Sequence, residues 1–201
     1  MKDGFFPALG TPLDREGTLN RTSFGKQIER MIDAGAAGLL CMGSMGNMVS
    51  IRDQDYPDIV EACVEAAAGR VPVMAGVMDN SVARVMDRIY SFGDIEIEGV
   101  VATTPFYYKS SPEQIVSFFE KLASESYYPV YIYDLPSVTQ SPLDVVSLGA
   151  LVGHGNIAGI KSANYELLKS FKEEGRFKKG FEVLFSGLDI FDKAIQNGLG
   201  K

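Results

Sequence analysis

The sequence predicts an α/β fold of the (β/α)8 TIM-barrel class, and three observations predict it. Short apolar runs rich in β-branched residues recur at fairly even intervals, and segments with helical spacing lie between them. The first run is followed by Gly10-Thr11-Pro12-Leu13, which lacks the glycine fingerprint of a cofactor-binding doubly wound sheet. Regular alternation of strands and helices implies parallel pairing with right-handed crossovers, and a barrel satisfies it.

Seven apolar runs are predicted to be strands, because each is short, continuous and bounded by turn residues. Runs of this kind are typical of parallel strands that are buried on both faces. In order they are Phe5–Leu9, Gly38–Met42, Val71–Gly76, Gly99–Thr103, Val130–Asp134, Ile157–Lys161 and Glu182–Ser186.

Six segments between these runs carry apolar residues at helical spacing. They are Thr22–Ala34, Arg52–Ala67, Val82–Phe92, Pro112–Glu125, Pro142–Leu151 and Tyr165–Glu174. Pro112 and Pro142 each follow a serine. That order predicts a capping serine and a first-turn proline at both helix starts.

The chain is short for a complete barrel. Eight βα units typically need about 250 residues, whereas the sequence has 201. We therefore expect residues 1–201 to form a single, incomplete TIM-barrel domain, truncated after the seventh βα unit. Residues 197–201 are predicted to form the turn that would lead into an eighth strand.

Composition excludes several classes of partner. The chain is 46% hydrophobic and 22% charged, as a soluble globular protein is, and its net charge is −7. No basic run could track a phosphate backbone, so neither nucleic acid nor an anionic membrane is an expected partner. No signal peptide or membrane span is visible, which predicts a cytoplasmic protein. Cys41 and Cys63 lie in apolar segments and are predicted to be buried, reduced thiols.

Polar residues and glycines collect at the carboxyl ends of the predicted strands. In a barrel these ends surround one mouth, which is where such folds keep their chemistry. The residues are Thr11, Gly43, Ser44, Met45, Gly46, Asn47, Gly76, Thr103, Thr104, Tyr107, Tyr133, Lys161, Ser186 and Gly187. Hydroxyls, glycines and one lysine are therefore expected to converge.

Lys161 is the most informative of these residues, because it ends an otherwise apolar strand. Partial desolvation there would depress the lysine pKa and favour the neutral amine, which can attack a carbonyl to form an imine. Tyr133 ends the preceding strand and could shuttle a proton beside it. Taken singly, Lys161 could merely begin a loop and Tyr133 could be a core aromatic. The segment Gly43–Gly46 could hold an anion or be an ordinary turn.

Other chemistries lack the residues that they need. His154 is the only histidine, so Ser-His-Asp catalysis, Cys-His catalysis and a zinc or iron site are not expected. No phosphate-binding loop motif occurs. The sequence therefore predicts neither a metal nor a cofactor.

Four motifs together resemble the dihydrodipicolinate synthase and N-acetylneuraminate lyase family of class I aldolases. They are Gly43-Ser44-x-Gly46, Thr104-Pro105-Phe106-Tyr107-Tyr108, Tyr133-x-x-Pro136 and Gly159-Ile160-Lys161, in family order and spacing. The likeness extends from Phe6 to Asp189.

The resemblance implies a TIM barrel in which Lys161 forms an imine with pyruvate or another 2-keto acid. Tyr133 would be the general acid and base, and Ser44 and Tyr107 would extend a hydroxyl relay. It also implies that the backbone of Ser44 and Met45 holds the keto-acid carboxylate, and that the chain forms a homo-oligomer, a tetramer or a dimer. Further expected substrate contacts are Thr11, Gly187 and Asp189, the last a candidate for binding a polyol.

Three departures from the family pattern bear on the substrate. Met45 and Asn47 replace the second hydroxyl and the acid of the usual turn, and the eighth strand is missing. Val138 stands where dihydrodipicolinate synthases place an arginine for the aldehyde carboxylate. Val138, together with Ser44 and Phe106-Tyr107-Tyr108, which resemble the N-acetylneuraminate lyase branch, favours a lyase for a 2-keto-3-deoxy sugar acid. The alternatives are a synthase condensing pyruvate with aspartate semialdehyde, and a catalytically impaired paralogue that binds a keto acid.

Overall fold

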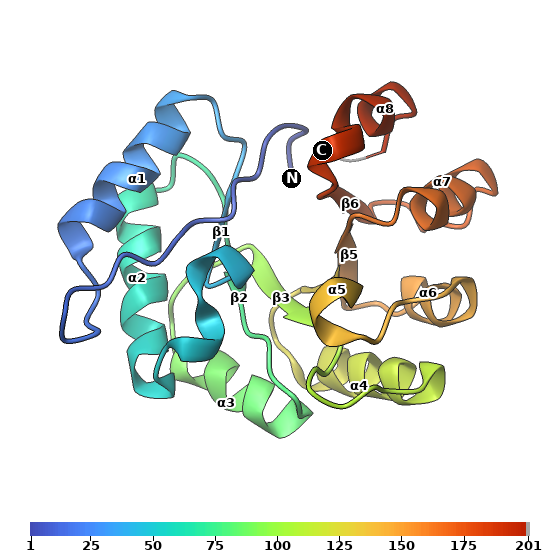
Figure 1. Ribbon diagram of the computed structural model, residues 1–201, viewed down its shortest axis with the longest axis horizontal. Helices are drawn as coiled ribbons and strands as arrows, with labels where there is room; N and C mark the ends of the chain where they lie inside the picture. Colours follow the sequence, from blue (N-terminus) through green and yellow to red (C-terminus); the bar gives the residue numbers. More distant parts are fainter. Residues whose placement is uncertain (200–201) are drawn as a thin grey trace. The chain divides into compact units, whose positions relative to one another are not determined.

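The computed structural model describes residues 1–199 and has a parallel α/β architecture (Figure 1). The described residues contain one sheet, in which the strands follow one another in chain order from β1 to β6. The strands are β1 (Leu39–Cys41), β2 (Val73–Gly76), β3 (Gly99–Thr103), β4 (Val130–Asp134), β5 (Ile157–Ser162) and β6 (Glu182–Phe185). The α/β class expected from the sequence is therefore confirmed.

Helices alternate with the strands along the chain, beginning with α1 before β1. The α-helices are α1 (Arg21–Asp33), α2 (Tyr56–Ala67), α3 (Val82–Ser91), α4 (Pro112–Glu125), α5 (Pro136–Thr139), α6 (Val145–Val152), α7 (Tyr165–Glu173) and α8 (Phe191–Gln196). Short 3-10 turns are η1 (Ser44–Gly46), η2 (Met48–Ser50), η3 (Asp53–Asp55) and η4 (Leu188–Ile190). Among the described residues no helix is both long and apolar enough to cross a membrane.

The chain divides into two compact units. The first unit consists of Met1–Met78 and Met86–Val101, and it carries β1, β2 and most of β3. The second unit consists of Asp79–Val85 and the chain from Ala102 onward, and it carries β4, β5 and β6. Strand β3 and helix α3 each contribute residues to both units.

The strand predicted at Phe5–Leu9 does not form. Only a single parallel bridge joins Ala8 to Leu40 of β1, with hydrogen bonds from Leu9 N to Leu40 O and from Leu40 N to Pro7 O. The reason is Pro7, which has no backbone N–H to extend the ladder. The other six predicted strands all form, and β3 and β4 have the predicted bounds. Residues 197 and 198 form a turn, whereas the last two residues of the predicted final turn lie outside the described part of the chain.

One of the two predicted proline-led helix starts is confirmed. At α4 the Ser111 side chain accepts from the Gln114 N–H and the Gln114 side chain accepts from the Ser111 N–H, which completes a capping box. The start predicted at Pro142 is wrong, because α6 begins at Val145. There Asp144 caps the helix by accepting from the Ser147 N–H, and this carboxylate is a stronger start signal than the serine and proline before it.

The core of the first unit forms where β1 and β2 pack against helices. Strands β1 and β2 are buried along their whole length, and so are Ile59, Val60 and Cys63 of α2. Cys41 and Cys63 are buried and free, as predicted. A hydrogen bond to Cys41 and burial together raise the pKa of the Cys63 thiol, which is therefore inert at neutral pH.

We predict that S111A lowers the free energy of unfolding by about 1 kcal/mol, because the α4 capping box loses its serine acceptor. Urea denaturation followed by far-UV circular dichroism measures this change. Ser117, exposed in the middle of the same helix, provides the control. If S117A destabilises the chain as much as S111A does, the cap is not what stabilises the start of α4.

Candidate active site

Buried polar contacts show which face of the sheet in the second unit is covered by helices. Ser162 Oγ donates to Asp134 Oδ2 at 2.8 Å, and Leu143 N donates to Asp134 Oδ1 at 3.2 Å. Leu143 lies just before α6, so Asp134 and Ser162 face the helices. Successive side chains of a strand alternate between faces, so Tyr133 and Lys161 face the opposite side.

Lys161 and Tyr133 are brought together on that opposite face. They are direct partners in the β4–β5 register, and Lys161 Nζ lies 4.2 Å from the centroid of the Tyr133 ring. Tyr133 is 7% exposed and Lys161 is partly buried. Burial lowers the pKa of the Lys161 amine to about 8, because desolvation penalises the charged form. At pH 7 about a tenth of the amine is therefore the unprotonated nucleophile, far more than for a lysine with the ordinary value of 10.5.

The carboxylate behind this pair holds the two strands together. Asp134 is 1% exposed, and burial raises its pKa, although the hydrogen bonds from Ser162 and Leu143 act in the opposite direction. Asp134 and Ser162 are partners in the β4–β5 register, one residue beyond Tyr133 and Lys161. This side-chain bond therefore fixes the strand ends on which the lysine and tyrosine stand.

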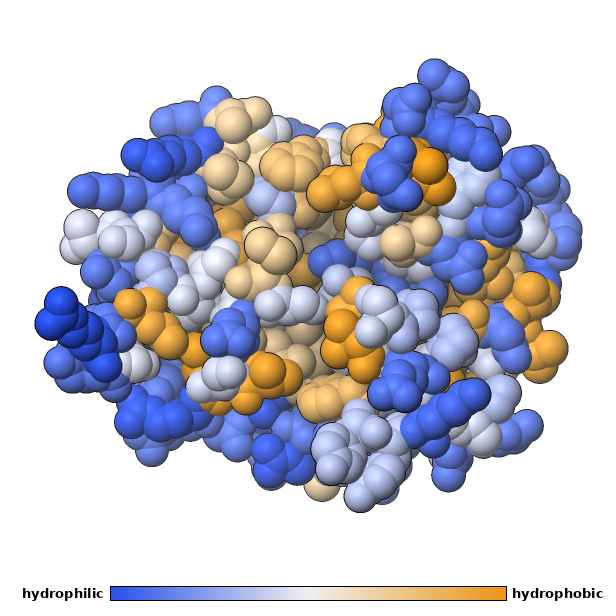
Figure 2. Space-filling model, in the orientation of Figure 1, coloured by the Kyte–Doolittle hydropathy of each residue, from blue (hydrophilic) through white to orange (hydrophobic). Residues whose placement is uncertain are grey.

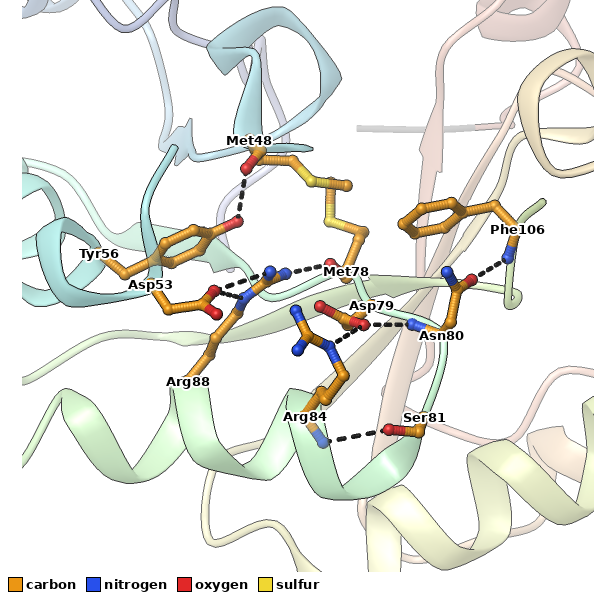
Figure 3. Close-up of polar contacts among 10 residues, drawn as sticks. All are labelled: Met48, Asp53, Tyr56, Met78, Asp79, Asn80, Ser81, Arg84, Arg88 and Phe106. Atoms are coloured by element: carbon orange, nitrogen blue, oxygen red, sulfur yellow. Dashed lines mark hydrogen bonds and ion pairs between the residues drawn. The ribbon is translucent and has the colours of Figure 1, made fainter. Parts of the chain in front are cut away.

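Tyr107 lies in the loop that follows β3, and an asparagine holds this loop (Figure 3). Asn80 Oδ1 accepts a hydrogen bond from Phe106 N at 2.7 Å. Tyr107 has φ +78°, a conformation that is strained for a non-glycine residue. Its side chain is 78% exposed and packs edge-on against Tyr108, with ring centroids 4.8 Å apart. Tyr107 is thus exposed to solvent on a loop that the Asn80 side chain holds in place.

The segment that carries Asn80 is itself anchored. Asp79 is 5% exposed, and its Oδ1 accepts from the Asn80 N–H and from Arg84 Nε, each at 2.7 Å (Figure 3). The Ser81 hydroxyl accepts a hydrogen bond from the N–H of Arg84 at 3.3 Å. This contact lies at the start of α3. These contacts join the start of α3 to the tyrosine-bearing loop.

Gly187 and Asp189 lie just beyond β6 in the same unit. Gly187 is buried, and a side chain there would meet the Phe185 ring at 2.8 Å, so the position accepts only glycine without rearrangement. Asp189 is exposed in η4, where its carboxylate is available to a ligand. Their substrate contacts remain predictions.

In the first unit, the turn after β1 carries Ser44 and Met45. Ser44–Gly46 forms a 3-10 turn that ends at Asn47, whose φ is +52°. The N–H groups of Gly46 and Asn47 are used within this turn, by Gly43 O and Ser44 O. A side chain at position 46 would come within 3.0 Å of Thr11 Oγ1. Thr11 therefore packs against this turn, and its contact with substrate remains a prediction.

A buried arginine secures the segment that follows this turn. Arg88, 7% exposed, contacts Asp53 through Nε and Nη2 and donates to Met78 O, and its guanidinium lies 4.6 Å from the Tyr56 ring centroid (Figure 3). The Tyr56 hydroxyl donates to Met48 O at 3.2 Å. The chain from Met48 to Tyr56 is thereby fixed within the first unit. Ser44 and Met45 are both exposed, and their roles remain predictions.

Val138 lies on α5, a short helix that the sequence did not predict. Its side chain is 58% exposed. No basic residue occurs in Pro136–Thr139, so α5 itself offers no cation to a carboxylate.

Sequence reasoning missed three residues that position this site: Asn80, Asp134 and Ser162. Asp134 and Ser162 carried a signal, because a carboxylate and a hydroxyl at the ends of two apolar runs need partners once they are buried. Asn80 carried none, since its partner lies 26 residues away. Within residues 1–199 no group of histidine, cysteine and acidic side chains could hold a metal ion.

Figure 2 shows hydrophobic side chains exposed among hydrophilic ones on one face of the molecule. Several of the most exposed large apolar residues follow strand ends: Met45, Val49, Tyr107, Tyr108, Val138 and Leu188.

The family model for the dihydrodipicolinate synthetase family matches residues 1–200 of the chain. The chain belongs to this family. It is 30% identical over 190 residues to 4-hydroxy-tetrahydrodipicolinate synthase of Shigella dysenteriae, which covers 94% of this chain. The chain spans 65% of the length of that relative.

Solved structures of the family have the same fold. Dihydrodipicolinate synthase from Aquifex aeolicus matches with a TM-score of 0.90 at 24% identity, over 98% of this chain and 68% of its own. A chloride-inhibited dihydrodipicolinate synthase from Acinetobacter baumannii, solved with pyruvate, matches with the same TM-score at 21% identity and the same coverages. The family predicted from the four motifs is thus confirmed.

The burial of Lys161 has a consequence for stability. Below pH 8 the folded protein must carry a desolvated charge, and this cost disappears as the pH rises from about 8 to the ordinary lysine value of 10.5. We therefore predict that K161M is more stable than the parent protein at pH 7, by on the order of 1–3 kcal/mol. The difference should shrink as the pH approaches 10.5.

Urea denaturation at a series of pH values measures this difference. K121M, at an exposed position of α4, is the matched control and should show no pH-dependent gain. A K161M advantage that stays constant from pH 7 to pH 10.5 would mean that desolvation does not depress the pKa of Lys161.

Proposed function

We propose that this chain carries the imine-forming site of a class I pyruvate aldolase, with Lys161 as the nucleophile. The observation that carries the proposal is the partly buried Lys161 amine beside the Tyr133 ring, with its pKa lowered to about 8. A neutral amine can attack the C2 carbonyl of a keto acid, whereas an ammonium cannot. Membership of the dihydrodipicolinate synthetase family, and the pyruvate in the Acinetobacter structure, support pyruvate as the keto acid.

The reaction would begin when Lys161 Nζ adds to C2 of the keto acid, giving a carbinolamine. Tyr133 would deliver a proton to the departing hydroxyl, so that water leaves and the imine forms. In the cleavage direction the hydroxyl at C4 would give up its proton, the C3–C4 bond would break, and its electron pair would pass to the imine as an enamine. Protonation at C3 and hydrolysis would then return pyruvate and the free lysine.

The remaining predicted residues would bind and relay. Ser44 and Tyr107 would extend the proton relay from Tyr133, and the backbone N–H groups of Ser44 and Met45 would hold the carboxylate. Thr11, Gly187 and Asp189 would contact the rest of the substrate. The reaction needs no metal or cofactor.

For the substrate that is cleaved we propose a 2-keto-3-deoxy sugar acid, whose C2 carbonyl would form the imine with Lys161. Val138 is exposed and α5 has no cation, so a second carboxylate would lack a bidentate partner there. Exposed Asp189 could instead accept hydrogen bonds from sugar hydroxyls. A homo-oligomer, a tetramer or a dimer, is part of the same proposal.

The names of the relatives favour a second candidate. Relatives from Shigella dysenteriae and Escherichia coli, 30% and 31% identical to this chain, are named 4-hydroxy-tetrahydrodipicolinate synthases. On this reading the chain would condense pyruvate with aspartate semialdehyde. A catalytically impaired paralogue that retains keto-acid binding is the third reading, motivated by Met45.

Reductive trapping tests the nucleophile. Pyruvate with sodium borohydride should attach a reduced three-carbon acid to Lys161, because borohydride reduces the imine to a stable secondary amine. Peptide mass spectrometry locates the adduct. K161A should abolish it and K121A should retain it, whereas an unmodified Lys161 peptide in the parent protein would contradict the proposal.

Substitution at Val138 tests the choice between sugar-acid cleavage and condensation with aspartate semialdehyde. V138R should leave sugar-acid cleavage within about threefold and lower the KM for aspartate semialdehyde by at least tenfold, because an arginine there pairs with a carboxylate. V138Q, which is similarly polar and uncharged, serves as the control. Faster condensation than sugar-acid cleavage in the parent protein would reverse the order of the two candidates.

A further inference from the structure

Thr103, the last residue of β3, has a hydroxyl that nothing in the described structure satisfies. The residue is 3% exposed. Its Oγ1 atom is buried and has no hydrogen-bond partner within residues 1–199. A buried hydroxyl without a partner destabilises the folded state, since it has lost its bonds to water. The mechanism proposed above does not use this group.

Contacts within the second unit determine which face of the sheet Thr103 occupies. Leu143 N donates to Asp134 Oδ1 at 3.2 Å, so the segment that leads into α6 lies on the helix side of the sheet. Thr104, the residue after Thr103, donates from Oγ1 to Ser141 O in that segment at 3.1 Å, so Thr104 faces the helices too. Successive side chains of a strand alternate between faces, which places the Thr103 side chain on the opposite face.

That opposite face is the one that carries the lysine. In the sheet β3 is hydrogen-bonded beside β4, and β4 is beside β5. Tyr133 and Lys161 both turn away from the helices, as derived from Asp134 and Ser162. Thr103, Tyr133 and Lys161 therefore stand on the same face of three successive strands, each at or next to the strand's carboxyl end.

The chemistry of a lone hydroxyl narrows what it can bind. A threonine hydroxyl offers one donor and two acceptor positions and no charge, which matches a neutral hydroxyl or carbonyl oxygen better than a carboxylate. Rotation about χ1 exchanges its hydroxyl and methyl groups within one volume, so a ligand can draw the hydroxyl toward itself.

Strands β3 and β5 are about 10 Å apart. The oxygens of a three-carbon acid bound to Lys161 lie close to the lysine and far from Thr103. A longer chain carries further oxygens, and these can extend toward Thr103 on β3.

We propose that the Thr103 hydroxyl is a specificity group of this site, hydrogen-bonding an uncharged oxygen on the chain beyond the keto-acid head and so favouring hydroxylated 2-keto acids. The inference rests on the proposed function and deepens it, because it assigns the substrate's hydroxyls a partner on the sheet itself. The Thr103 hydroxyl is left unsatisfied in the free protein because the ligand supplies its hydrogen-bond partner.

The test compares T103V, which removes the hydroxyl at nearly constant volume, with T103S, which keeps it. Isothermal titration calorimetry measures the Kd of pyruvate and of 2-keto-3-deoxygluconate, and borohydride trapping measures the adduct at Lys161. We expect T103V to weaken binding of the sugar acid about tenfold and that of pyruvate less than twofold. T103S should stay within threefold of the parent protein for both ligands.

A stability measurement accompanies the binding data. T103V should melt at the same temperature as the parent protein or higher, because it removes an unpaired buried hydroxyl.

Unchanged sugar-acid affinity in T103V, or an equal loss for both ligands, would overturn the role of Thr103. If the parent protein binds the sugar acid without forming an adduct, the imine mechanism fails, and the ratio of the two Kd values still decides the role of Thr103. Absence of sugar-acid binding in the parent protein would overturn the inference while leaving a pyruvate adduct to support the imine site.

Discussion

The ammonium of Lys161 would lie in a place where water cannot solvate it fully, and the account of this chain depends on that constraint. Its Nζ is 4.2 Å from the centroid of the Tyr133 ring, on a strand whose other residues are mainly apolar. Desolvation brings the amine pKa to about 8, within reach of neutral pH. One physical effect thus supplies the nucleophile, at a cost in stability when the amine is charged.

Three polar features of the second unit surround this pair. The bond from Ser162 to Asp134 ties β4 to β5 on the helix side, directly beyond the lysine and tyrosine. Asn80 fixes the loop that presents Tyr107. Thr103 has an unpaired hydroxyl on the same face of the sheet as Lys161. The buried Asp134 and Ser162 thus brace the site, and the proposed role of Thr103 gives its unpaired hydroxyl a partner in the ligand.

Much of the fold was predictable, because periodicity and strand length are local properties. Buried β3 and β4 could be bounded from their apolar residues alone, and Lys161 stood out because a charge ended such a run. Failures occurred where a single residue decided the outcome. Pro7 prevents a strand that its neighbours favour, and the Asp144 cap moves the start of α6 past Pro142.

The parts of the site that escaped prediction depend on pairings between distant residues. The hydrogen bond from Phe106 N to Asn80, like the one between Ser162 and Asp134, follows only from the folded chain. The unsatisfied state of Thr103 is likewise invisible in a sequence, since a threonine at a strand end ordinarily finds a partner.

The most direct test of the central claim is the titration of Lys161 itself. Carbon-13 NMR of lysine labelled at Cε, with the Lys161 signal assigned by its loss in K161M, reports the ionisation of that amine. A midpoint near pH 8 is predicted for Lys161, well below the ordinary lysine value of 10.5. A midpoint for Lys161 near 10.5 would contradict the account.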